Sequence, residues 1–224
     1  MKNISFFVFI LVIILLTRCN NQTKPTDKDS LKIKDNKLSV KKVSPEATED
    51  SISLYNLVVQ LYKWHITDTA CKCSFTPLKK NPSDTLYTDI DLDDNEKVIN
   101  KLKQTGLFNT DFLVNYRKIA LRMDKELRDG TSLWREGELS TFGDDSDAWC
   151  NCQDYPVDDY WKIIRLTPIQ YNVDKSEAIF KWTWGGDFYY EVKAKKESNN
   201  WKISYLQGFD MNAYSWEWWK KNKH

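Results

Sequence analysis

Glycine, proline and histidine are scarce in this chain of 224 residues, which has seven glycines, six prolines and two histidines. The low glycine and proline content argues against a disordered or low-complexity protein. Lysine and arginine number 33 and aspartate and glutamate 32, so the basic excess of a nucleic-acid-binding protein is missing. Aromatic residues, by contrast, make up 14% of the chain and include ten tryptophans, which is typical of a folded domain with an aromatic core.

The longest apolar run lies at the start of the chain, from Phe6 to Leu16. It falls short of the roughly 20 residues that a membrane-spanning helix needs, so residues 1–19 are predicted to form an export signal. The run ends in Leu-Thr-Arg-Cys, which resembles the lipobox of bacterial lipoproteins. That resemblance implies cleavage before Cys19 and attachment of lipid such as palmitate to its thiol. Arg18 stands where a small residue is usual, and an uncleaved signal anchor is the alternative.

Both interpretations predict an exported protein, held by its N-terminus at the outer membrane or the periplasmic face of the bacterial cell envelope. Residues 20–45 are polar and contain few large apolar side chains, so they are expected to form a flexible linker. Residues 46–210 are long enough for one domain with a substantial core. Residues 211–224 form an aromatic and basic tail.

Helical spacing dominates the first half of the domain. Apolar residues share one face of a helix predicted over 46–67: Ile52, Tyr55, Val59, Tyr62 and Ile66. Leu54, Val58 and Leu61 widen this face. A second helix is expected over 95–104 with its end at Gly106, and a third from the N-cap residue Thr110 to Asp129. Buried positions are expected along the third: Phe112, Tyr116, Ile119, Met123 and Leu127.

One acidic segment before the second helix has two interpretations. Asp89, Asp91 and Asp93 match the first ligand positions of an EF-hand calcium loop. The glycine and the bidentate glutamate that this loop needs are missing. The preferred interpretation is a helix start, in which Asp93 is the N-cap and Glu96 completes a capping box.

The second half of the domain changes to alternating apolar and polar residues. Strands are predicted over 178–184 and 188–195, joined by a hairpin at Gly185-Gly186, and further strands over 161–171 and 201–205. Helices followed by an antiparallel meander indicate the α+β class, with N-terminal helices packed on a curved antiparallel sheet.

This order of elements resembles the nuclear transport factor 2-like (cystatin-like) superfamily, and within it a group of bacterial lipoproteins of unknown function. The segments that carry the resemblance are Val58-Val-Gln-Leu-Tyr-Lys-Trp64, Phe112-Leu-Val-Asn-Tyr-Arg117, Gln153-Asp-Tyr-Pro156 and Trp201-Lys-Ile203. It covers residues 46–210 and implies a cone-shaped α+β fold. Because this fold supports enzymes, binding modules and immunity proteins alike, it implies no catalytic residue.

Besides Cys19 the chain has two Cys-x-Cys pairs, Cys71 with Cys73 and Cys150 with Cys152. In an extended chain both thiols of a pair point to the same side. Bridging within a pair is the least favoured arrangement, because two extended residues separate the Cα atoms too far. Disulfides between the pairs are therefore predicted, as export favours oxidation. A four-thiolate zinc or copper site and redox thiols are the alternatives, and no cofactor is expected.

Aromatic residues suggest where a ligand could bind. In a cone-shaped fold, Trp64, Trp182, Trp184 and Tyr190 could line a pocket for an apolar or sugar ligand, and Phe188, Trp134, Trp149 and Trp161 could join them. Filling of the core by the same rings is the alternative. In the tail, Trp216, Trp218 and Trp219 precede Lys220, Lys221 and Lys223, a pattern that suits either a membrane interface or docking on the domain.

Candidates for catalysis are few. Any mechanism with a histidine base needs His65, paired with an aspartate; the alternative is a histidine at a helix boundary. The acidic belt around the second cysteine pair could bind a cation or form a solvated loop: Asp144, Asp145, Asp147, Asp154, Asp158 and Asp159. The leading hypothesis is a non-enzymatic, envelope-tethered module that binds a protein or a small ligand. An immunity-type protein that neutralises a toxin and a small-molecule enzyme are the alternatives.

Overall fold

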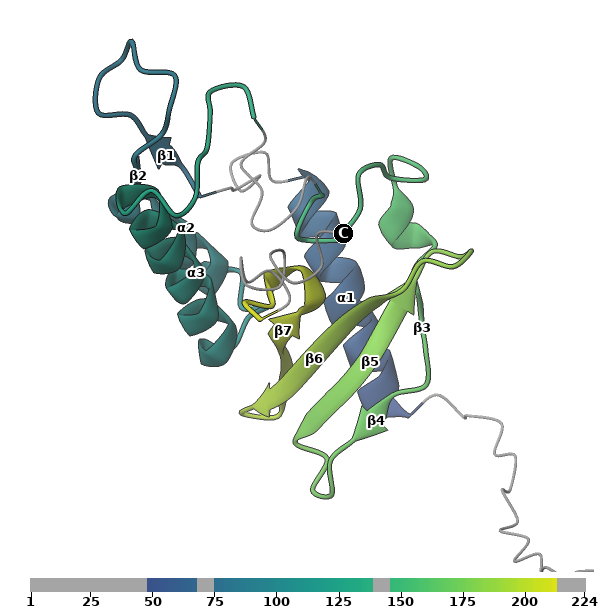
Figure 1. The fold of residues 1–224 in the computed structure, drawn as a ribbon. Helices are drawn as coiled ribbons and strands as arrows, with labels where there is room; N and C mark the ends of the chain where they lie inside the picture. Colours follow the sequence, from purple (N-terminus) through teal and green to yellow (C-terminus); the bar gives the residue numbers. More distant parts are fainter. Residues whose placement is uncertain (1–47, 68–74, 139–145, 213–224) are drawn as a thin grey trace, which may run out of the picture. The chain divides into compact units, whose positions relative to one another are not determined.

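The computed structural model describes residues 48–67, 75–138 and 146–212, all of which belong to one compact unit (Figure 1). The predicted export signal, Cys19, the linker, Cys71, Cys73 and the end of the tail from residue 213 onward lie outside these ranges. Within the described part of the chain, no helix combines the length and apolarity that a membrane crossing requires.

Helix α1 spans Glu49–Thr67. Its buried side chains follow one helical stripe: Leu54, Leu57, Val58, Leu61, Tyr62 and His65. The predicted face is confirmed in part. Leu54, Val58, Leu61 and Tyr62 are buried, but Ile52 and Tyr55 are exposed. The domain thus buries the stripe that holds the leucines.

Helix α2 spans Leu92–Gln104 and helix α3 spans Thr110–Arg128. Each helix begins after a side chain that accepts a backbone hydrogen bond, Asp91 from the amide of Asp94 and Asn109 from the amide of Phe112. The predicted caps Asp93 and Thr110 were therefore wrong, by two residues and by one. Glu96, expected to close a capping box, forms an ion pair with Arg117.

The buried residues of α3 largely match the prediction: Phe112, Tyr116, Ile119, Ala120, Asp124 and Leu127. Met123 is only partly buried. A two-stranded sheet of β1 (Pro77–Leu78) and β2 (Asp89–Ile90) lies against α3.

The main sheet is antiparallel and contains β3 (Arg165–Leu166), β4 (Gln170–Tyr171), β5 (Glu177–Thr183), β6 (Tyr190–Glu197) and β7 (Asn200–Leu206). The order is β3-β5-β6-β7, and β4 also pairs with β5. The strand predicted over 161–171 is broken, because Trp161 lies in the short 3-10 helix η2 (Tyr160–Lys162).

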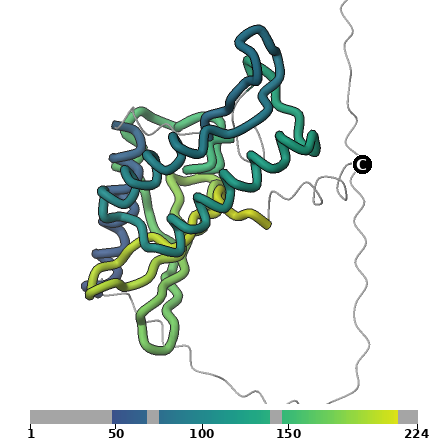
Figure 2. Tube along the Cα trace, turned by 90° about the vertical axis from the view of Figure 1, so that its left-hand side faces the viewer, coloured from purple at the N-terminus to yellow at the C-terminus, as the bar shows by residue number. Residues whose placement is uncertain are grey.

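Three helices followed by antiparallel strands confirm the α+β class. Helix α1 crosses one face of the sheet, while α2 and α3 form a pair on the side of β7 (Figures 1 and 2). The inner face of the sheet is apolar in strict alternation, with Ala178, Phe180 and Trp182 on β5 facing the core. Between α2 and α3, the backbone at Leu107 and Asn109 bonds to Ile203, which covers the edge of β7.

After β7 the chain forms the 3-10 helix η3 (Gln207–Phe209). Gly208 packs directly on the backbone of the loop that holds the second cysteine pair. A Cβ atom at this position would lie 1.8 Å from the carbonyl oxygen of Ala148. The amide of Gly208 also donates to the hydroxyl of Tyr190, at 2.9 Å.

We predict that Asp124→Ala lowers the free energy of unfolding by about 1–3 kcal/mol, because it leaves a buried amide without its acceptor. Asp124 is buried on α3, accepts from the amide of Ile90 on β2 at 3.0 Å and binds Arg128 at 2.8 Å. Denaturant unfolding of the variant measures this loss. The exposed Asp187→Ala is the control, with an expected change within about 0.5 kcal/mol. Equal changes in both variants would contradict the role given to Asp124.

Candidate functional site

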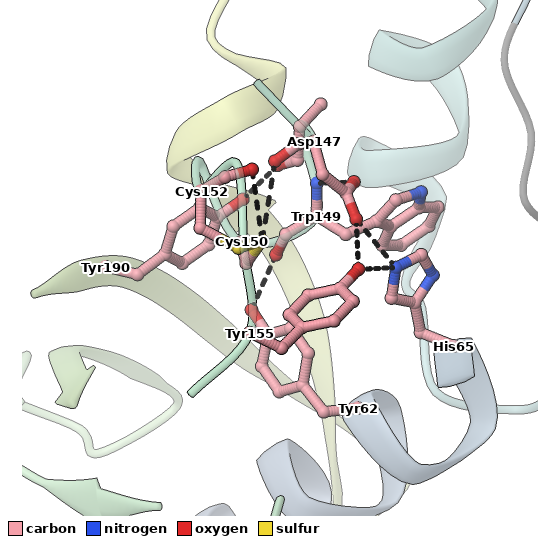
Figure 3. A network of polar contacts seen from close by, with 9 residues as sticks. Tyr62, His65, Asp147, Trp149, Cys150, Cys152, Tyr155 and Tyr190 are labelled. Carbon is pink, nitrogen blue, oxygen red and sulfur yellow. Dashed lines mark hydrogen bonds and ion pairs between the residues drawn. A yellow bond between two sulfur atoms is a disulfide. The ribbon is translucent and has the colours of Figure 1, made fainter. Parts of the chain in front are cut away.

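Three segments that are far apart in the sequence meet at the C-terminal end of α1. His65 comes from α1, Asp147 from the loop before the sheet, and Tyr155 from the segment that leads to η2 (Figure 3). The Nε2 atom of His65 lies 3.1 Å from Oδ2 of Asp147, and the hydroxyl of Tyr155 donates to the same oxygen at 2.6 Å. These three side chains form the His65–Asp147–Tyr155 network, which brings an imidazole, a carboxylate and a phenol together.

The carboxylate of Asp147 accepts three hydrogen bonds. His65 and Tyr155 bind Oδ2, and the amide of Trp149 donates to Oδ1 at 3.0 Å. Burial by itself raises the pKa of Asp147. This effect is outweighed by the hydrogen bond and charge attraction of His65 together with the hydrogen bonds from Tyr155 and Trp149, which lower the pKa. The net result is a pKa below the ordinary value, so Asp147 is ionised at neutral pH.

The same contacts fix the protonation of the partners. Burial and the bond to Asp147 raise the pKa of Tyr155, so its hydroxyl keeps its proton and acts as a donor. Because an ionised carboxylate can only accept, the proton between His65 and Asp147 sits on Nε2 of His65.

The imidazole of His65 is enclosed. The residue is 4% exposed and stacks on Trp149 with ring centroids 5.3 Å apart. Its Nδ1 atom is buried and has no hydrogen-bond partner among the residues that the structure describes. Neither ring nitrogen therefore faces solvent: one is engaged by Asp147 and the other is covered.

A second set of hydrogen bonds lies beneath this network. The hydroxyl of Tyr62 donates to the carbonyl oxygen of Trp149 at 2.8 Å and accepts from Nε1 of Trp182 at 2.9 Å. The hydroxyl of Tyr190 donates to the carbonyl oxygen of Ala148 at 2.7 Å. Tyr62 of α1 and Tyr190 of β6 thus bind the loop backbone at residues 148 and 149, and Trp182 of β5 supports Tyr62.

A disulfide within the second Cys-x-Cys pair joins Cys150 to Cys152 (Figure 3). The judgement that bridging within a pair is least favoured was wrong here, because it assumed an extended chain. The segment instead turns: the amides of Cys150 and Asn151 both donate to the carbonyl oxygen of Asp147, and the amide of Asp147 donates to Cys152. Asn151 adopts a positive φ of 54°, and the Cα atoms of the two cysteines approach to 5.2 Å.

This bridge is local, which limits its effect on global stability. Closing a three-residue loop contributes about 1.6 kcal/mol in the chain-entropy model, against about 4 kcal/mol for a bridge across nearly 80 residues. The disulfide therefore acts mainly on the loop that carries Asp147. Within residues 48–67, 75–138 and 146–212, no cluster of three metal-ligating side chains is found.

The four aromatic residues expected to line a pocket are core components to different degrees. Trp182 and Tyr190 are completely buried, while Trp64 and Trp184 are partly buried. Tyr62, Tyr160 and Trp182 pack together with centroid distances from 4.5 to 6.2 Å. In this structure, aromatic side chains occupy the space between α1 and the sheet.

The aspartates of the acidic belt lie in different environments. Asp147 is in the polar network, whereas Asp154, Asp158 and Asp159 are exposed, and Asp144 and Asp145 lie outside the described residues. In the calcium-like segment, Asp89 pairs with Arg128 at 2.9 Å and Asp91 caps α2. These contacts favour the helix-start interpretation of that segment over calcium binding.

A partly exposed aromatic surface adjoins the network, and the sequence predicted it only in part: Trp161, Trp184 and Phe188 were named as possible lining of a pocket, but Tyr155 was not. We call it the aromatic rim and define it as Tyr155, Trp161, Trp184 and Phe188. The first three rings all contact the buried ring of Tyr160, and Trp184 stacks on Phe188 at 4.0 Å. Exposed apolar residues flank the rim on the same two segments: Val157, Ile163 and Tyr189.

The sequence did contain one signal for the rim. Aromatic and apolar residues are interleaved with polar ones throughout 155–163, without the strict alternation of a strand. This pattern indicates a loop that exposes apolar side chains.

We predict that Asp147→Asn weakens the acid sensitivity of folding. The folded-state pKa of Asp147 is lowered, so its ionisation stabilises the fold above the unfolded-state pKa of about 4. That stabilisation is lost as the pH falls from about 4 through the folded-state value. Denaturant unfolding measures the free energy of unfolding from about pH 7 down to about pH 2. This free energy should fall less for Asp147→Asn than for the control variant Asp158→Asn, in which an exposed aspartate is replaced. Parallel pH profiles would contradict this assignment.

We predict that Cys150→Ala with Cys152→Ala lowers the free energy of unfolding by about 1.6 kcal/mol, well below the roughly 4 kcal/mol of a long-range bridge. In the unsubstituted protein, mass spectrometry after alkylation should find Cys150 and Cys152 unalkylated and within the same peptide. A peptide that links residue 150 or 152 to Cys71 or Cys73 would contradict the local pairing.

No family model matches this chain, and no curated protein or solved structure matches it either.

Proposed function

We propose that this protein is a non-enzymatic, envelope-tethered interaction module and that the aromatic rim is its binding surface. The observation that carries this proposal is the exposure of several large apolar side chains together at one end of the sheet. Val157 and Tyr189 are each 50% exposed and Tyr155 is 39% exposed, next to the partly buried rings of Trp161 and Trp184. Clustered exposed aromatic residues are typical of recognition surfaces.

The base of this surface is held in place, which favours binding. Tyr155 is hydrogen-bonded to Asp147, whose loop is closed by the disulfide and bonded to Tyr62 and Tyr190. A preformed surface loses less conformational entropy when a partner binds. The interior of the domain, where Trp182 and Tyr190 are fully buried, is a less favourable place for a ligand.

The finer assignment of the fold belongs to the same proposal. A cystatin-like cone, of the kind found in nuclear transport factor 2-like lipoproteins, agrees with the order of the helices and strands. Lipidation of Cys19 and a linker over 20–45 would hold the domain at the bacterial cell envelope. There the rim would meet a protein partner or a small ligand, and in the immunity-type version of this proposal the partner is a toxin.

An enzyme is the second candidate, and the pair of His65 and Asp147 favours it. A histidine oriented by a buried carboxylate is the arrangement of a general base. In this geometry Asp147 engages Nε2, so Nδ1 would have to act as the base, and it is covered. The network is therefore better suited to holding the loop than to transferring protons to a substrate.

The test is photo-cross-linking in the living bacterium. A benzophenone amino acid replaces Val157, Tyr189 or Val173, one at a time, in the full-length protein. Val173 is the matched control, because it is fully exposed but lies beyond the opposite end of β5. We expect a discrete adduct from positions 157 and 189 that is absent from 173. The same adducts from all three positions, or none from any, would refute the proposed surface.

A further inference from the structure

The last described segment passes the loop that supports the aromatic rim and ends against α3, where Arg122 donates to the carbonyl oxygen of Met211 at 3.2 Å. Gly208 contacts the backbone of Ala148, and the rings of Phe209 and Trp149 lie 4.8 Å apart. Asp147, which binds the hydroxyl of Tyr155, is the next residue of that loop. The chain after residue 212 therefore starts on the α3 side of the loop that supports the rim.

Chain length is sufficient for the tail to reach the rim. Residues 213–224 span at most about 40 Å when fully extended.

Charge around the rim is predominantly negative. Four exposed aspartates lie on its two segments: Asp154, Asp158, Asp159 and Asp187. Against them stand Lys162, which is already paired with Asp159, and Arg165. The surface thus offers aromatic rings together with unbalanced carboxylates.

The C-terminal tail has the complementary composition. Residues 213–224 contain three tryptophans and three lysines but one acidic residue, Glu217. Tryptophan rings pack favourably against exposed aromatic rings, and lysine ammonium groups pair with carboxylates and with ring faces.

We propose that residues 213–224 dock on the aromatic rim of the same molecule, with Trp216, Trp218 and Trp219 against its rings and the lysines beside its aspartates. This inference rests on the proposed function, because it treats the rim as a binding surface and names its resident occupant. An external partner must then displace the tail, so the tail limits binding to partners that outcompete an aromatic and basic segment. Because the tail belongs to the same molecule as the rim, docking is intramolecular and the effective concentration of the tail is high.

Zero-length carbodiimide cross-linking of the full-length protein in detergent tests this proposal. The reagent joins lysine amines to carboxylates in direct contact. We expect links from Lys220, Lys221 or Lys223 to Asp154, Asp158 or Asp159. These links should disappear when the three aspartates are replaced by asparagine, because the reagent then has no carboxylate to activate at these positions. Asp174→Asn, an exposed aspartate at the opposite end of β5, is the control that should keep the links.

The pair of Lys202 and Glu197, at 3.0 Å, provides an internal reference for the reaction in every sample. Mixing ¹⁴N- and ¹⁵N-labelled protein separates links within one molecule from links between two. Mixed-isotope links alone would overturn the proposal in favour of a second copy as the occupant. Tail links to other surfaces, or none while the reference forms, would also overturn it.

Phosphatidylglycerol vesicles test the membrane as the competing occupant. We expect the links to persist in their presence; loss of the links with insertion of the tryptophans into the vesicles would overturn the proposal. If the photo-cross-linking gives adducts from positions 157 and 189 but the carbodiimide gives no tail link, only the docking of the tail is refuted. Missing adducts at those positions would refute the interaction surface itself.

Discussion

The hydroxyl group of Tyr62 is the point through which the parts of the domain are connected. It donates to the loop at Trp149 and accepts from Trp182 on β5, while its ring is carried by α1. Burial raises the pKa of Tyr62 well above its ordinary value, so the hydroxyl remains a neutral donor and acceptor. A buried hydroxyl that lost these partners would be costly, and the helix, the loop and the strand are therefore held in one arrangement.

The proposed binding surface depends on this arrangement. Residues 147–155 have little regular structure, yet they are fixed by the disulfide, by the three bonds to Asp147 and by the tyrosines beneath. A loop fixed in this way can present Tyr155 and its aromatic neighbours in a defined geometry. In the function that we propose, the histidine and aspartate that would suggest catalysis in another setting hold that geometry.

The sequence predicted the regular parts of the fold well, because periodicity reports directly on burial. The alternation in β5, β6 and β7 and the buried face of α3 are examples. The face of α1 was harder, since apolar residues cover more than one stripe and tertiary packing decides between them. Helix starts were missed by one or two residues because several neighbouring side chains are equally good caps.

The candidate site could be anticipated only in part. The sequence indicated that His65 would need an aspartate, but six aspartates of the acidic belt were available and only the fold selects Asp147. The Cys150–Cys152 bridge could not be foreseen from spacing, since it depends on a turn whose hydrogen bonds come from Asp147. Trp161, Trp184 and Phe188 were expected to line a pocket, but the surface that they form with Tyr155 was not foreseen. It joins segments about 25 residues apart, and neither is distinctive alone.

Gly208 shows how a position remote from any chemistry can control the site. Its backbone lies so close to Ala148 that a methyl group would collide with a carbonyl oxygen at 1.8 Å. Any side chain there must push η3 away from the loop, and the disturbance would pass to Asp147 and to the tail that follows. In a saturation-mutagenesis survey this glycine would score as intolerant as a residue of the binding surface, although its contribution is purely steric. Intolerance at Gly208 should accordingly be interpreted as evidence of close packing and not of contact with a partner.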